Sequence, residues 1–123
     1  MTPLLTRNDA RPRLHFVVAL FLAGSVLAIY GQVYGFDFLN YDDTLYITEN
    51  DRTQQGLDLD NVKWAFTTGH ASNWHPLTWL SYMLEVSLFG VAPAAHHLVN
   101  VLFHAANTVL LFYLLRAMTG GAL

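Results

Sequence analysis

The sequence contains no cysteine and few charged residues. Only 12% of its 123 residues are Asp, Glu, Lys or Arg, whereas 54% are hydrophobic. Without cysteine there can be no disulfide, no thiolate nucleophile and no thiolate metal site. The charged share is about half that of an average soluble domain, and the net charge of −3 gives no support for nucleic-acid binding. The composition therefore favours a protein whose partner is the lipid bilayer.

Charge is missing altogether from two long stretches. No Asp, Glu, Lys or Arg occurs from Leu14 to Phe36, which would extend about 34 Å as a helix. The stretch from Ala94 to Leu115 would extend about 33 Å, and Pro93 suits its first turn. Because the hydrocarbon core of a bilayer is about 30 Å thick, we expect both stretches to cross it. The first stretch is longer than the usual core of a signal peptide, which is the competing interpretation.

The charged residues are sorted by sign around these stretches. Four of the six basic residues flank them on the outer side: Arg7, Arg11, Arg13 and Arg116. Short loops rich in Lys and Arg stay in the cytoplasm, so we expect both ends there and the acidic loop outside. The expected organisation is a cytoplasmic N-terminus (1–13), a first transmembrane helix (14–34), a non-cytoplasmic loop (35–92), a second transmembrane helix (93–117) and a truncated cytoplasmic end (118–123).

The loop is expected to contain one short amphipathic helix and one interfacial helix. The first lies near 58–68, where Leu59, Val62 and Phe66 recur at helical spacing and Asp58 can cap the start. The second lies near 76–89, between Pro76 and Gly90. Its leucines share one face, and aromatic residues gather near its start: Trp74, Trp79 and Tyr82. Such rings settle at the membrane surface; the alternative is a helix packed in a protein core.

Two adjacent acids follow the first stretch and are the strongest candidates for chemistry. Asp42 and Asp43 could act as a general base pair or as ligands for a divalent metal. The structural alternative is an Asx-type turn or helix cap, followed by a short extended piece from Thr44 to Thr48. Tyr41, directly before the pair, is a candidate substrate contact. The spacing alone leaves both interpretations open.

Histidines and asparagines form a polar stripe in the second stretch. His97, Asn100, His104 and Asn107 share one helical face. In lipid, such groups either contact a ligand such as a lipid phosphate or join helices through hydrogen bonds. A zinc site is disfavoured because no carboxylate or thiolate joins the stripe at ligand spacing.

Two further polar residues of the loop have open roles. His75 is a candidate substrate or phosphate contact, or simply the residue before a helix start. Glu85 lies among apolar residues, where it either reaches water or pairs with Lys63.

Several sequence blocks, in this order, resemble the first part of a known membrane family. They are Phe38-Leu39-Asn40-Tyr41-Asp42-Asp43, Tyr46-Ile47-Thr48-Glu49-Asn50, Val62-Lys63-Trp64-Ala65-Phe66-Thr67-Thr68, Trp74-His75-Pro76-Leu77-Thr78-Trp79 and His96-His97-Leu98-Val99-Asn100. The family is that of the transmembrane-and-tetratricopeptide-repeat proteins, including bacterial relatives. It is similar to GT-C glycosyltransferases such as the protein O-mannosyltransferases.

The resemblance implies a fold and a reaction. GT-C enzymes have a many-helix membrane bundle and transfer sugar from a polyprenyl-phosphate donor to an acceptor outside the cytoplasm. Asp42 matches their catalytic acidic position, with Asp43 beside it. The chain itself carries no tetratricopeptide repeat, and two spans cannot enclose the lipid and sugar of the donor, so we expect an inactive N-terminal fragment. Its expected location is a bacterial inner membrane. The runner-up is a non-catalytic anchor or scaffold for protein–protein interaction.

Overall fold

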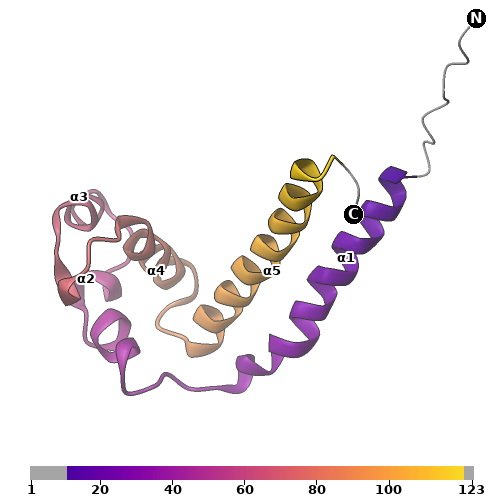
Figure 1. Cartoon of the computed structure of the whole chain (residues 1–123). Coiled ribbons are helices and arrows are strands. Elements are labelled where there is room, and N and C mark those ends of the chain that lie inside the picture. The colour runs from indigo at the N-terminus through magenta and orange to yellow at the C-terminus, as the bar shows by residue number, and fades with distance from the viewer. Residues whose placement is uncertain (1–10, 121–123) are drawn as a thin grey trace, which may run out of the picture. The chain divides into compact units, whose positions relative to one another are not determined.

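The computed structural model describes residues 11–120, which contain helices and no strand. The elements in chain order are α1 (Arg11–Tyr30), η1 (Gly31–Gly35), η2 (Thr44–Thr48), α2 (Asp51–Gln54), α3 (Leu59–Thr67), η3 (His70–Ser72), α4 (Pro76–Phe89) and α5 (Pro93–Met118) (Figure 1). The expected role of Arg7 and the expected cut after Gly120 fall outside the described residues. The chain divides into two compact units: α1 with α5 from Val101 onward, and Gln32–Asn100.

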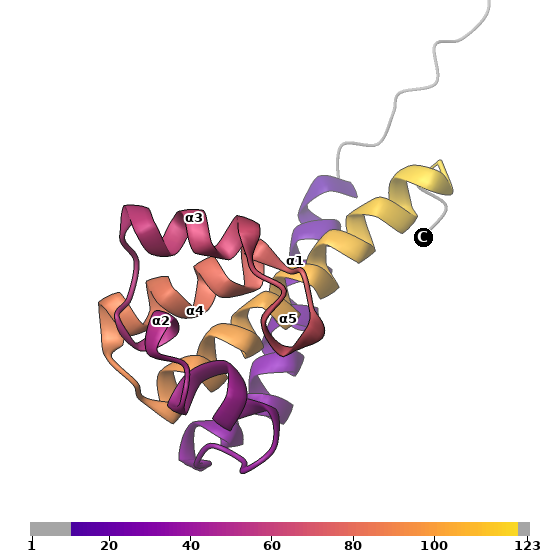
Figure 2. The same ribbon diagram turned by 90° about the vertical axis from the view of Figure 1, so that its left-hand side faces the viewer.

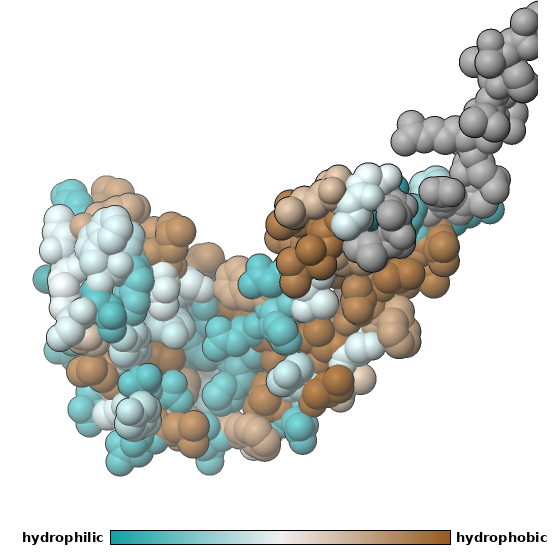
Figure 3. Space-filling model, in the orientation of Figure 1, coloured by the Kyte–Doolittle hydropathy of each residue, from teal (hydrophilic) through white to brown (hydrophobic). Residues whose placement is uncertain are grey.

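Two helices are long and apolar enough to cross a membrane. They cover Pro12–Gly35 and Pro93–Met118, and only 11% of the apolar window of each is buried. The core helix of a soluble protein would be mostly buried instead. Hydrophobic residues, brown in Figure 3, cover much of the visible surface of α1 and α5. The predicted all-α membrane fold is thus confirmed.

Small residues and aromatic rings mark where α1 and α5 meet within the first unit. The ring of His15 lies 6.4 Å from that of Phe112, and Tyr30 meets His104 edge-on at 5.1 Å. The buried apolar residues of the two helices here are small or medium in size: Ala19, Val26, Val101 and Ala105. The contact between α1 and α5 is thus confined to a few side chains, and most of both apolar surfaces remains exposed.

The second unit has a small core centred on α4. Trp79 and Met83 of α4 are fully buried together with Ala65 of α3, and α2 and α3 pack against α4 (Figure 2). The membrane-surface position that the sequence predicts for the Trp79 ring is wrong, because this ring is buried. The indole is buried because Tyr46 and α3 supply a core that the periodicity of α4 alone does not reveal.

Three leucines of α4 face away from this core, whereas Leu80 packs against it. Leu77, Leu84 and Leu88 have 76%, 46% and 64% of their surface exposed. The helix therefore combines a buried face with an exposed apolar face, which is what a helix lying at a membrane surface requires. Its position at the membrane surface stays a prediction.

The ends of α4 and the start of α3 follow the expected signals. Pro76 opens α4, and Gly90 ends it at φ 71°, a left-handed conformation that favours glycine. Asp58 caps α3 by accepting the backbone N–H of Asn61 at 2.7 Å.

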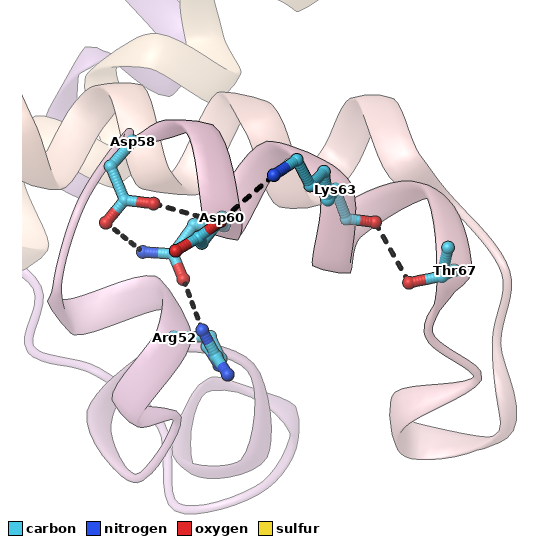
Figure 4. Close-up of polar contacts among 6 residues, drawn as sticks. Arg52, Asp58, Asp60, Lys63 and Thr67 are labelled. Carbon is cyan, nitrogen blue, oxygen red and sulfur yellow. Dashed lines mark hydrogen bonds and ion pairs between the residues drawn. The ribbon is translucent and has the colours of Figure 1, made fainter.

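The side chain of Asn61 joins the starts of α2 and α3. It is fully buried and accepts a hydrogen bond from Arg52 of α2 at 3.1 Å. Figure 4 labels Arg52 and Asp58, and its dashed lines mark the hydrogen bonds that each makes with Asn61.

The segment from Thr44 to Thr48 is helical, so the prediction of an extended conformation there is wrong. It forms one π-helical turn, in which the Glu49 N–H donates to the carbonyl oxygen of Thr44 at 2.9 Å. The segment is rich in β-branched and aromatic residues, which favour strands. Residues 11–120 offer no partner strand, however, and a helical turn satisfies the backbone locally.

Candidate functional site: an acidic turn beside a buried glutamate–histidine pair

The two acids lie in a turn that closes on itself, here called the acidic turn (residues 39–44). The carboxylate of Asp43 accepts the backbone N–H of Leu39 at 2.9 Å, and the Tyr41 N–H donates to the Leu39 carbonyl at 2.8 Å. The hydroxyl of Thr44 adds a bond to the side chain of Asn40 at 3.1 Å. Asp43 therefore holds the shape of the turn, as the structural interpretation of an acidic pair requires.

Asp42 differs from its neighbour in its surroundings. Its side chain is exposed, and no hydrogen bond or ion pair among residues 11–120 engages the carboxylate. Tyr41, the candidate substrate contact, has 82% of its surface exposed. The acidic turn thus presents one free carboxylate and one accessible phenol on a backbone that Asp43 fixes.

Tyr82 of α4 belongs to the same neighbourhood. Burial raises the pKa of its phenol above the usual 10.0, and the charges of Glu85, Asp43, Tyr46 and Asp42 raise it further. The carboxylates of the acidic turn are therefore within electrostatic reach of this hydroxyl. A phenol that keeps its proton is a hydrogen-bond donor at neutral pH. The sequence suggested only a membrane-surface role for this ring.

Glu85 and His96 form a buried pair that joins α4 to the start of α5. Oε2 of Glu85 lies 2.6 Å from Nδ1 of His96, and the two side chains are 6% and 2% exposed. Ser81 donates its hydroxyl to Oε1 of Glu85 at 2.7 Å. Both roles expected for Glu85 are wrong, because the carboxylate is buried and Lys63 pairs with the exposed Asp60 at 3.2 Å.

His97 lies beside the segment that leads into the acidic turn. Its Nε2 is 3.4 Å from the carbonyl oxygen of Asp37, and its ring centroid is 6.3 Å from that of Phe38. The ring of Phe38 also contacts His96 at 5.6 Å. Two consecutive histidines of α5 therefore contact the two residues immediately before the turn.

The other proposed contacts are spread more widely. His75 packs on Tyr46 at 5.4 Å and on Trp79 at 4.7 Å. Its buried Nε2 has no hydrogen-bond partner among the described residues. Asn100 is exposed, whereas His104 meets Tyr30 within the other unit. The structure therefore places His97 against the two residues before the acidic turn and His75 against Tyr46, which follows it.

The histidine and acid positions do not define a metal site. Within residues 11–120, no three side chains of His, Cys, Asp or Glu converge closely enough to hold a metal ion. The divalent metal considered for the acidic pair therefore has no ligand set in the part of the chain that the structure describes.

Tyr82 and the Glu85–His96 pair are the parts of this region that sequence reasoning missed. One signal was available: only residues 90–92 separate α4 from α5. A connection that short keeps the last turns of α4 near the first turn of α5. An acid in the former and a histidine in the latter could have been paired on that ground.

The chain is similar to one curated relative. It is 32% identical to Protein O-mannosyl-transferase TMTC1 of Mus musculus over 134 aligned residues. The alignment covers 89% of this chain but only 14% of the mouse protein. No protein-family model matches the chain, and no solved structure matches it. Nearly the whole chain is therefore similar to a short part of a much longer O-mannosyl-transferase.

Proposed function

We propose that the chain is part of an integral-membrane glycosyltransferase. The enzyme would take a sugar from a polyprenyl-phosphate donor and transfer it to a protein hydroxyl outside the cytoplasm. The proposal is supported by the similarity to the mouse O-mannosyl-transferase and by two helices able to cross a membrane. It is also supported by an acidic turn that begins a few residues after the first of these helices.

Asp42 is the proposed general base. The observation that carries this role is the contrast within the pair, since Asp43 is bonded to Leu39 while Asp42 is exposed and unengaged. Asp42 would take the proton of a Ser or Thr hydroxyl as that oxygen bonds to the anomeric carbon. The bond between the sugar and the lipid phosphate breaks, and the phosphate leaves with the electron pair. Such base assistance contributes about 10²–10⁴-fold. Asp43 would hold the turn and remains the second candidate for the base.

The departing phosphate needs hydrogen-bond donors or positive charge. His97 is the best placed of the histidines, because it lies beside the segment before the acidic turn. Asn100 and His104 continue the same helical face into the apolar part of α5, where the lipid end of the donor would lie. His75 and the exposed Tyr41 would contact the sugar or the acceptor.

The proposed orientation places both ends in the cytoplasm and the acidic turn on the opposite side. It is supported by the basic residues, of which four flank the outer sides of the two apolar stretches and two lie in the loop between them. A bacterial inner membrane gains no support from the relative, which is a mouse protein.

Transfer from a labelled polyprenyl-phosphate sugar tests this assignment in the full-length polypeptide that contains the chain. Asp42→Asn should lower kcat by about 10²–10⁴-fold. Asp37→Asn is the matched control, because Asp37 is an exposed acid of the same segment whose backbone, not its carboxylate, meets His97. Full transfer by a folded Asp42→Asn protein would remove Asp42 as the base.

A non-catalytic anchor is the second candidate function. The hydrogen bond from Leu39 to Asp43 favours it, because that bond is what an acidic pair makes when it serves only to shape a turn. This candidate predicts that the full-length protein transfers no sugar under conditions in which Protein O-mannosyl-transferase TMTC1 does. Any transfer that depends on Asp42 would exclude it.

A further inference from the structure

The buried pair between α4 and α5 is the best-defined polar contact near the acidic turn. Both oxygens of the Glu85 carboxylate are engaged, one by Ser81 at 2.7 Å and one by Nδ1 of His96 at 2.6 Å. This 2.6 Å separation makes the carboxylate and the imidazole direct neighbours in a buried contact. Burying a carboxylate without such partners is costly, so the orientation of the His96 ring is fixed by Glu85.

The His96 ring in turn lies between two aromatic rings. Its centroid is 5.6 Å from that of Phe38 and 5.9 Å from that of Tyr82, which it meets edge-on. Phe38 belongs to the segment before the acidic turn, whereas Tyr82 belongs to α4. The imidazole therefore holds Phe38 against a helix whose own core position is set by the buried Trp79 and Met83.

The contact with Phe38 reaches the acidic turn through one peptide bond. Leu39, the next residue, donates its N–H to the carboxylate of Asp43 at 2.9 Å. Asp37, the preceding residue, has its carbonyl oxygen 3.4 Å from Nε2 of His97. The backbone entering the turn is thus contacted at three consecutive residues. Among the side chains that make these contacts, only His96 is buried.

We propose that His96, oriented by Glu85, is a positioning residue for the acidic turn. It fixes where Asp42 points without touching a substrate itself. The role of Asp42 as a base rests on the proposed function, whereas the coupling from Glu85 through His96 and Phe38 to the turn does not. The two claims can therefore fail separately.

The mobility of the acidic turn can be measured with a label on a single introduced cysteine, because the chain contains no cysteine of its own. Tyr41→Cys places a single thiol on the turn at a position that is 82% exposed. A nitroxide attached there reports the mobility of the turn by electron paramagnetic resonance, with the full chain in lipid nanodiscs. In the otherwise unchanged chain, the spectrum should contain an immobile component.

Alanine substitutions test each link. His96→Ala and Phe38→Ala should each remove the immobile component, and Glu85→Ala should do the same. Glu85→Ala combined with His96→Ala should have no larger effect than either alone, because the two residues act through one another. Lys63→Ala is the matched control: it breaks the exposed ion pair with Asp60 in the same unit and should leave the spectrum unchanged.

A conservative variant separates positioning from general loss of fold. Glu85→Gln keeps a side chain of the same shape, with an oxygen at the position of Oε2, so the immobile component should return. The ¹⁵N resonances of the His96 ring should change more in Glu85→Ala than in Glu85→Gln. Far-UV circular dichroism checks that the helices persist.

An immobile label in a helical His96→Ala chain would overturn the proposal, as would a mobile label in Glu85→Gln. A label that responds as expected, in a full-length protein whose Asp42→Asn variant still transfers sugar, would overturn the base assignment alone. A third outcome is that Asp42→Asn abolishes transfer while the nitroxide spectrum stays the same in His96→Ala. That outcome would overturn the positioning role of His96 but keep Asp42 as the base.

Discussion

The indole of Trp79 stacks on the phenol ring of Tyr46, with centroids 5.0 Å apart and planes inclined by 21°. This contact joins α4 to η2, the turn that directly follows the two acids. The small core of the second unit therefore also fixes the C-terminal side of the acidic turn.

Trp79→Ala should destabilise the second unit by about 3–5 kcal/mol, because it removes a fully buried aromatic side chain from a close-packed core. Denaturant unfolding in detergent, followed by tryptophan fluorescence and circular dichroism, measures the loss. Trp74→Ala is the control, since Trp74 has 68% of its surface exposed. An equal loss in the two variants would contradict the core assigned to Trp79.

Asn61→Ala should lower the free energy of unfolding by about 1–3 kcal/mol. The buried amide donates to the carbonyl of Gly56 at 2.9 Å and accepts from Arg52 at 3.1 Å, and alanine leaves those groups unpaired. The neighbouring Asp60→Ala removes only an exposed ion pair with Lys63 and should change stability little. Thermal unfolding of the two variants side by side measures the difference.

Gly56→Ala should destabilise the chain, because Gly56 has a left-handed φ of 79° and a Cβ there would lie 2.5 Å from Oγ of Ser87. That hydroxyl accepts the Leu57 N–H at 2.7 Å, so a shift of Ser87 would cost a hydrogen bond. We expect a loss of about 1–3 kcal/mol. Gly24→Ala in α1 has open space around the new methyl group and should cause no such loss. A neutral Gly56→Ala would show that Ser87 moves aside freely.

The raised pKa of Tyr82 predicts how stability depends on pH. Because the folded protein holds this proton more tightly than the unfolded chain, the stability it contributes is fully present below the ordinary pKa of 10.0. It is lost as the pH rises through the higher folded value. Absorbance at 295 nm should show one tyrosine titrating later than the rest, and Tyr82→Phe should remove that late step. A single common titration of all tyrosines would contradict the burial of this hydroxyl.

The helix boundaries could be predicted because local chemistry determines them. Pro76 and Gly90 delimit α4 as expected, and Asp58 caps α3 as expected. Chain segments that depend on distant partners could not be predicted in this way. Thr44–Thr48 has the composition of a strand, but it forms a π-helical turn because no strand of the described chain pairs with it.

The candidate site was only partly predictable for the same reason. The acidic pair was recognisable from its place after an apolar stretch and from the surrounding sequence blocks. The different surroundings of Asp42 and Asp43 depend on one hydrogen bond to Leu39 that no spacing rule reveals. The pairing of Glu85 with His96 depends on how α4 turns back at Gly90, so the sequence indicated Lys63 as a partner instead.

The short connection between α4 and α5 links the position of α4 to that of a helix in the bilayer. At 26 residues, α5 is about 39 Å long, which exceeds a hydrocarbon core of about 30 Å, so it must tilt or protrude. Residues 90–92 and the Glu85–His96 pair fasten α4 to the first turn of this helix. A lipid environment that reorients this first turn of α5 would therefore carry α4 and the acidic turn with it, because all three belong to the unit Gln32–Asn100.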